Sequence, residues 1–228
     1  IGNNNIEKIK KQKIKIVVDP NGGTGIFSID IFKKIGIDVV GVNSEIGKFS
    51  RVIEPNEQSL SYLKKIINEN NADFGAGFDC DADRAEILLK DGRIVSGNEM
   101  LALASYYFFS KFNNGKYNNG NDNNKTINNE KIKEKIIVVN DATSNVVKEV
   151  ANQFNAKIIE TGVGEANVVS EMYKQNALLG GEGSSSGVII PPSRCRDGTL
   201  SLLTILSFMA NENKTIEELI DLLPKYYT

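Results

Sequence analysis

The chain has 228 residues, 40% of them hydrophobic, and a formal net charge of -2 at pH 7. This length is enough to bury a sizeable core and predicts one large domain or two small ones. The near-neutral charge argues against a nucleic-acid partner. No apolar run approaches the roughly 20 residues that a membrane span needs, so we expect no membrane partner either.

Missing residue types narrow the chemistry further. Histidine is absent, which excludes Ser-His-Asp and Cys-His nucleophiles and any metal site that contains histidine. Cys80 and Cys195 are the only cysteines and lie far apart, so we expect no disulfide framework and a cytoplasmic location. No secretory leader is visible, and because the sequence begins with Ile1 we expect the numbering to start inside a longer polypeptide.

The first half of the chain alternates between short apolar runs and segments with helical spacing. Phe27, Ile31 and Ile35 recur at helical intervals before Gly36 ends the pattern. The predicted elements are a strand at 14–19, a helix over 27–35, a strand at 37–42, a helix over 56–70, a strand at 72–78 and a hairpin over 86–97.

An asparagine-rich stretch, residues 113–129, separates the two halves. It offers almost nothing to bury, so we predict a disordered or loosely ordered segment. The predicted domains are therefore residues 1–112 and 131–228, joined by a linker at 113–130. An insertion inside a single domain is the open alternative.

The second half repeats the alternation. The predicted elements are strands at 135–141, 156–160 and 176–181, and helices over 147–154, 165–174, 198–210 and 215–223. Strands alternating with helices predict an α/β fold of two similar α/β/α domains with mainly parallel sheets. Ligands of such sheets bind at the loops beyond the carboxyl ends of the strands, where this chain has three polar loops.

The first of these loops carries Asp79, Asp81 and Asp83 at every second position, with Arg84 directly behind. Alternate residues of an extended loop point the same way, so the three carboxylates can converge on one hard cation such as Mg²⁺. An EF-hand counted from Asp79 would need glycine and glutamate where Arg84 and Lys90 stand. A phosphatase of the haloacid-dehalogenase type and a solvated acidic turn remain as alternatives.

Two glycine-containing stretches are weaker signals. "PNGGTG" at residues 20–25 could hold a phosphate at a helix start, but it matches neither a P-loop nor a dinucleotide motif, which favours a simple connecting turn. "TGVGE" at residues 161–165 fits a phosphate contact and plain helix entry equally well. Cys80 lies among carboxylates that should raise its thiol pKa, so we do not expect a reactive thiolate.

The last polar loop, residues 178–198, places Glu182 beside three serines just past a predicted buried strand. A carboxylate next to hydroxyl groups can bind the vicinal hydroxyls of a sugar. The alternative is a flexible surface loop. A nucleophilic serine is disfavoured, because Ser184, Ser185 and Ser186 have neither histidine nor a neighbouring lysine to activate them.

These motifs together resemble the α-D-phosphohexomutase family of phosphoglucomutases, phosphomannomutases and phosphoglucosamine mutases. Residues 79–84, D-C-D-A-D-R, are similar to the family's metal loop D-G-D-G/A-D-R, with Cys80 in place of glycine. Residues 54–60 resemble its E-P-x-x-x-x-L segment, and residues 161–169 its T-x-V-G stretch. Residues 181–184 resemble the start of its sugar loop, G-E-x-S-G. Beyond Ser184 the match ends, and the histidine of many members is missing.

The resemblance extends from about Ile14 to Thr228, apart from the asparagine-rich stretch, and implies the second and third of four domains. It implies an isomerase that interconverts hexose 1-phosphate and 6-phosphate through a phosphoserine and a bisphosphorylated sugar. The serine domain and the C-terminal phosphate-binding domain would be missing partners from the same polypeptide. A two-domain module that binds Mg²⁺ or a phosphosugar without turnover is the alternative.

The resemblance also implies a role for each matching residue. Asp79, Asp81 and Asp83 would hold Mg²⁺, and Arg84 would contact the transferring phosphate. Substrate-binding residues would be Glu182, Ser184 and Gly164.

Overall fold

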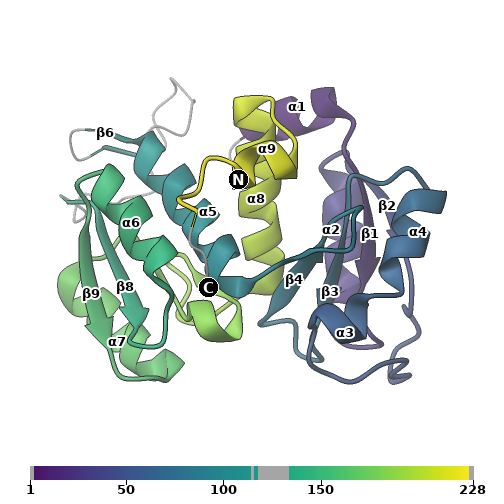
Figure 1. The fold of residues 1–228 in the computed structure, drawn as a ribbon, viewed down its shortest axis with the longest axis horizontal. Helices are drawn as coiled ribbons and strands as arrows, with labels where there is room; N and C mark the ends of the chain where they lie inside the picture. Colours follow the sequence, from purple (N-terminus) through teal and green to yellow (C-terminus); the bar gives the residue numbers. More distant parts are fainter. Residues whose placement is uncertain (1–2, 114–115, 118–133, 226–228) are drawn as a thin grey trace.

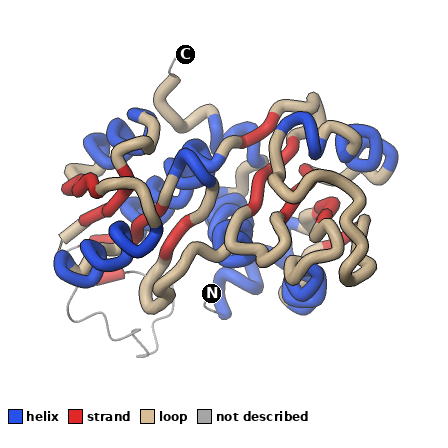
Figure 2. Tube along the Cα trace, turned by 90° about the horizontal axis from the view of Figure 1, so that it is seen from below, coloured by secondary structure: helices blue, strands red, loops and turns tan. Residues whose placement is uncertain are grey.

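The computed structural model describes residues 3–113, 116–117 and 134–225. Two β-sheets lie on either side of a layer of helices (Figure 1), and Figure 2 shows the same two groups of strands from below. The predicted α/β class is therefore confirmed; both sheets are mixed, and the second is mainly parallel, as predicted.

The first sheet has the strand order β2-β1-β3-β4-β5. Its strands are β1 (Lys15–Asp19), β2 (Asp38–Gly41), β3 (Phe74–Phe78), β4 (Ala85–Leu88) and β5 (Ile94–Val95). The central strand β1 runs parallel to both neighbours, whereas β4 is antiparallel to β3 and to β5. The hairpin predicted from the sequence is confirmed as β4 and β5.

The second sheet has the order β11-β10-β8-β9, with only β11 antiparallel to its neighbour. Its strands are β8 (Ile136–Asn140), β9 (Lys157–Thr161), β10 (Leu179–Gly181) and β11 (Val188–Ile189), and the short 3-10 helix η1 (Gly183–Ser185) lies between β10 and β11. A separate small pair is formed by β6 (Phe112–Asn113) and β7 (Lys116–Tyr117). Most of the asparagine-rich stretch falls outside the described residues, so its predicted disorder and the domain division around it stay predictions.

The helices are α1 (Asn3–Gln12), α2 (Ile26–Lys34), α3 (Glu57–Leu60), α4 (Leu63–Glu69), α5 (Gly97–Lys111), α6 (Asn145–Gln153), α7 (Glu165–Gln175), α8 (Gly198–Glu212) and α9 (Ile216–Ile220). Helices α3 and α4 cover the outer face of the first sheet, and α7 covers that of the second. The other helices contribute to one large core between the sheets. None of the helices in the described part of the chain is long and apolar enough to cross a membrane.

The helices differ from the prediction in three places, the first of which is α1, a helix that was not predicted from the sequence. The helix expected over residues 56–70 is divided into α3 and α4 by a turn at Ser61 and Tyr62. Helix α5 was not predicted from the sequence. Its residues are apolar on nearly every side, because α5 packs against α6, α8 and η1, and a helix buried all round lacks the amphipathic period that marks a surface helix.

The large core joins the inner faces of both sheets through α5 and α8. Phe208 of α8 is fully buried in it, and its ring lies 5.5 Å from those of Tyr106 and Tyr107 on α5. Because one set of side chains serves both sheets, the described chain should unfold as one unit.

Phe208→Ala should therefore lower the free energy of unfolding by about 3–5 kcal/mol, since it leaves a cavity between α5 and α8. Urea titration followed by circular dichroism measures this, and a single transition should move to lower urea. Phe27→Ala is the control: its ring is 65% exposed, so it should change stability by less than about 0.5 kcal/mol. Two transitions, of which only one moves, would contradict the shared core.

Candidate metal and ligand site

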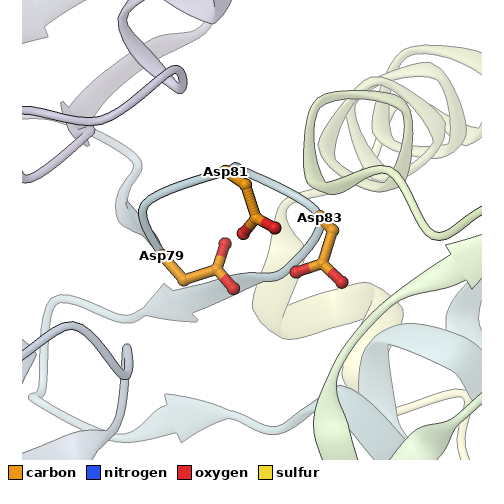
Figure 3. Close-up of side chains that lie close together, drawn as sticks. All are labelled: Asp79, Asp81 and Asp83. Atoms are coloured by element: carbon orange, nitrogen blue, oxygen red, sulfur yellow. The ribbon is translucent and has the colours of Figure 1, made fainter.

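An acidic loop connects β3 to β4 at the carboxyl end of β3. It carries Asp79, Asp81 and Asp83, and one carboxylate oxygen from each lies within 4.8 Å of the others. Figure 3 shows the three side chains turned toward one another from the same loop. Asp79 is buried, Asp83 is half-buried and Asp81 is exposed, so one side of the cluster is open to solvent.

Two other segments hold the acidic loop by close backbone contacts. The N–H of Thr24, in the turn after β1, donates to the Cys80 carbonyl over 2.8 Å, and a Cβ on Gly23 would lie 2.4 Å from the same oxygen. The N–H of Gly198, at the start of α8, donates to the Ala82 carbonyl over 2.9 Å. These approaches leave no room for side chains at either glycine.

The turn at residues 20–25 therefore has a structural role, because its N–H groups bind backbone carbonyls of neighbouring segments. The N–H groups of Gly22, Gly23 and Thr24 donate to the carbonyls of Asn43, Pro20 and Cys80 respectively. With these donors engaged by backbone oxygens, the geometry favours the connecting turn over a phosphate-binding loop. The turn also supports the acidic loop, which the sequence did not indicate.

Arg84 neutralises part of the charge from within the loop. Its Nε donates to Asp79 Oδ2 over 2.6 Å and lies 3.4 Å from Asp83 Oδ1, and its Nη1 donates to Glu54 Oε1 over 2.5 Å. Arg84 thus contacts carboxylates on both sides of the cluster.

The pKa of Asp83 is raised to about 6 by burial, together with the hydrogen bond and charge of Asp79, although the charge of Arg196 acts in the opposite direction.

Cys80 lies between two of these aspartates. Burial raises the pKa of its thiol, and the charges of Asp79 and Asp81 raise it further. A raised thiol pKa agrees with the expectation that Cys80 is not a reactive thiolate. Burial contributes more to the rise than the neighbouring carboxylates, which were the expected cause.

Glu182 is the centre of the second polar loop, just past β10. Its side chain is buried, and its Oε1 accepts hydrogen bonds from the Gly164 N–H over 2.8 Å and from Asn140 Nδ2 over 3.0 Å. The same amide of Asn140 lies 3.4 Å from Ser184 Oγ, and Ser184 is exposed. The structure thus brings together Glu182, Ser184 and Gly164, the three residues predicted to bind substrate.

Arg196 links this second loop to the acidic loop. Its Nη2 forms an ion pair with Asp83 Oδ2, its Nη1 lies 3.6 Å from Glu182 Oε2, and its Nε lies 3.2 Å from Glu165 Oε2. One guanidinium group therefore contacts carboxylates from the acidic loop, from the start of α7 and from the Glu182 loop. The two predicted sites form one connected polar region.

Three carboxylates that converge, with one side open to solvent, match the donor set of a hard divalent cation, which takes oxygen ligands and keeps several waters. Asp79, Asp81 and Asp83 are therefore the residues that could hold one. Arg84 and Arg196 reduce the repulsion among these carboxylates.

Sequence reasoning missed Arg196 and Asn140. Arg196 directly precedes Asp197, whose side chain accepts from the Leu200 N–H and caps α8. Asn140 ends β8 at the carboxyl edge of its sheet. A polar residue at a strand end was a usable signal for Asn140, whereas nothing local distinguishes Arg196 from other surface arginines.

Two family models match the chain. The model described as phosphoglucomutase/phosphomannomutase, alpha/beta/alpha domain II matches residues 1–92, and the model for domain III matches residues 96–226. The boundary between the models places α5 with the second match.

Relatives and solved structures agree with these models. A phosphoglucomutase/phosphomannomutase of Thermococcus kodakarensis is 33% identical over 97% of this chain and 45% of its own length. A phosphoglucosamine mutase of Methanococcus maripaludis is 32% identical over 95% of this chain and 46% of its own. The chain thus spans about half the length of these relatives.

Two solved structures share the fold. A phosphoglucomutase/phosphomannomutase family protein from Burkholderia thailandensis superposes with a TM-score of 0.75 at 19% identity, over 97% of this chain and 46% of its own. An N-acetylphosphoglucosamine mutase of Aspergillus fumigatus, solved with GlcNAc-6P and magnesium, superposes with a TM-score of 0.67 at 15% identity, over 97% of this chain and 48% of its own.

Gly23→Ala should weaken divalent-cation binding by about 10- to 100-fold, because the added Cβ would push the Cys80 carbonyl and displace the acidic loop. Isothermal titration of the chain with Mg²⁺ measures the effect. Gly162→Ala is the matched control, since the nearest atom to its added Cβ lies 3.9 Å away, and it should bind as the unmodified chain does. Equal affinity in both variants would show that the turn does not position the carboxylates.

Proposed function

The chain belongs to the phosphoglucomutase/phosphomannomutase family, and from this premise we propose that it is the metal-binding and sugar-binding part of a phosphohexomutase. The complete enzyme would be an isomerase that interconverts hexose 1-phosphate and hexose 6-phosphate. It would act through a phosphoserine and a bisphosphorylated sugar intermediate. Further domains of the same polypeptide would supply the serine and the main phosphate-binding loop. The cytoplasmic location stays a prediction.

The observation that carries this proposal is the ion-pair network of Arg196, which connects Asp83 to Glu182. A phosphoryl transfer to a sugar needs a cation near the phosphate and polar groups near the hydroxyls at the same time. Two separate polar loops would not meet this need. The contacts of Arg196 with Asp83 and Glu182 support one combined site.

Asp79, Asp81 and Asp83 would hold Mg²⁺ at the acidic loop. A bound Mg²⁺ would offset the negative charge of the transferring phosphoryl group. Arg84 would orient the same phosphate with its planar guanidinium group, which suits phosphate oxygens. Its present contacts with Asp79 and Glu54 hold the side chain at the edge of the cluster.

Glu182 and Ser184 would bind the sugar. A carboxylate accepts hydrogen bonds from two neighbouring hydroxyls, and the serine hydroxyl donates or accepts as needed. This pair can therefore bind a hexose in either of the two orientations that a mutase must accept. The hydrogen bonds from Gly164 and Asn140 fix the Glu182 carboxylate in place, so little ordering is needed on binding.

Asp81→Asn should abolish most Mg²⁺ binding and lower turnover of the complete enzyme by about 100-fold or more, because one anionic ligand is lost. The side chain is exposed, so folding should be unchanged. Asp91→Asn, in the β4–β5 turn, is the matched control and should keep full turnover. Near-normal turnover in Asp81→Asn would rule out the metal assignment.

Glu182→Ala should raise the KM for hexose phosphates by about 10-fold or more, since a buried polar acceptor for sugar hydroxyls is removed. Steady-state kinetics of the complete enzyme with glucose, mannose and glucosamine phosphates tests this. Glu217→Ala, on the exposed side of α9, should change nothing. An unchanged KM with all three sugars would contradict a sugar-binding role for this loop.

A further inference from the structure

Glu86 is a further buried carboxyl group, on the strand that follows the acidic loop. Glu86 is on β4, opposite Gly77 of β3, and its residue is only 8% exposed. Its Oε1 accepts a hydrogen bond from the Gly97 N–H over 3.2 Å and a short one from the Ser186 hydroxyl. Its Oε2 is buried and has no hydrogen-bond partner among the described residues.

Ser186 is in the Glu182 loop, and its position is tightly constrained. A Cβ on Gly97, the first residue of α5, would lie 2.4 Å from Ser186 Cα and 2.6 Å from its Oγ. Ser186 is buried and has φ of 50°, a conformation that costs energy for a residue with a side chain. Contacts on several sides must hold the loop there, and the hydrogen bond to Glu86 is one of them.

We propose that Glu86 is a positioning residue that holds the Glu182 loop against β4 through Ser186. As a role in sugar binding this rests on the proposed function, but the contact itself exists without ligand. It joins the strand that follows the acidic loop to the loop that carries Glu182 and Ser184. Glu86 would thereby set the spacing between the metal and the sugar.

The surroundings of Glu86 favour the neutral acid. Burial raises its pKa to about 8; the charges of Glu54 and Glu99 also raise it, whereas the Gly97 N–H and the charge of Arg84 lower it. On the Ser186 side, residues 183–187 are glycines and serines, and the charged groups are Arg196, whose side chain packs against Gly187, and its partner Glu182. An ionised carboxylate with an unpartnered oxygen would need water, which it can reach when the loop opens.

The pH dependence follows from this shift. The pKa of Glu86 is raised in the closed form, so the closed form is stabilised fully below the ordinary value near 4.5 and loses that stabilisation as pH rises toward about 8. The fraction of open loop should therefore increase by up to about tenfold per pH unit between about pH 5 and pH 8, and level off above.

Hydrogen exchange of the backbone amides at residues 183–188, corrected for intrinsic rates and with α6 as internal reference, tests the contact in the chain without ligand. In the unmodified chain, protection of these amides should fall as the pH rises from about 5 to about 8. Glu86→Gln keeps an acceptor and cannot ionise, so its protection should not change with pH. Ser186→Ala and Gly97→Ala should lose protection at every pH, the latter by displacing Ser186 while the carboxyl group stays intact.

Ser105→Ala is the matched control. Ser105 is buried, as Ser186 is, but its hydroxyl donates to the Leu101 carbonyl within α5, so protection of the loop should match the unmodified chain. The same pH dependence in Glu86→Gln, or full protection in both Ser186→Ala and Gly97→Ala, would overturn the proposal.

Titration of the unmodified complete enzyme with a hexose phosphate separates this proposal from the proposed function. If no hexose phosphate binds and the loop still opens with pH, the proposed function is wrong and the positioning contact remains. If the sugar binds and the loop protection of Glu86→Gln changes with pH as it does in the unmodified chain, the positioning role is wrong and the proposed function remains.

Discussion

The concentration of negative charge at the acidic loop is the constraint on which the rest of the site depends. Three carboxylates from five consecutive residues repel one another, and one of them is buried. Arg84 supplies positive charge from the loop itself, and Arg196 supplies it from the far side of the site. Because Arg196 also contacts Glu182, the charge balance of the acidic loop is tied to the position of the second loop.

Close packing constrains the site as strongly as charge. Gly23 and Gly198 let two backbones approach the acidic loop, and Gly97 lets a third approach Ser186. In each case a single added Cβ would come within 3 Å of its neighbour, closer than real side chains lie. The loops are thus positioned by backbone contacts with strands and helices, which move less than long side chains do.

The sequence was sufficient for the features that depend on local pattern. The longer strands of both sheets, the β4–β5 hairpin and the three polar loops follow from apolar periodicity and from where each run ends, whereas the two-residue strands β6, β7 and β11 were not predicted. Helix α5 was missed because burial on all sides removes that periodicity, and the break between α3 and α4 leaves no glycine or proline to mark it. Arg196 and Glu86 were missed for another reason: their partners are distant in sequence, so only the assembled fold shows that either residue belongs to the site.

The shared core determines how the two loops can respond to a ligand. Helix α8 packs against strands of both sheets and α5 against strands of the second, both contribute to the shared core, and each begins at a polar loop: α8 at the Ala82 carbonyl and α5 at Ser186. A change in the separation of the loops would therefore have to repack a dense interior, which is costly. A cation at the acidic loop would instead compete with Arg196 for Asp83, and the arginine could remain paired with Glu165 and Glu182. In the proposed function, the site thus adapts to metal and sugar by exchanging partners of one long side chain while both loops stay where the core holds them.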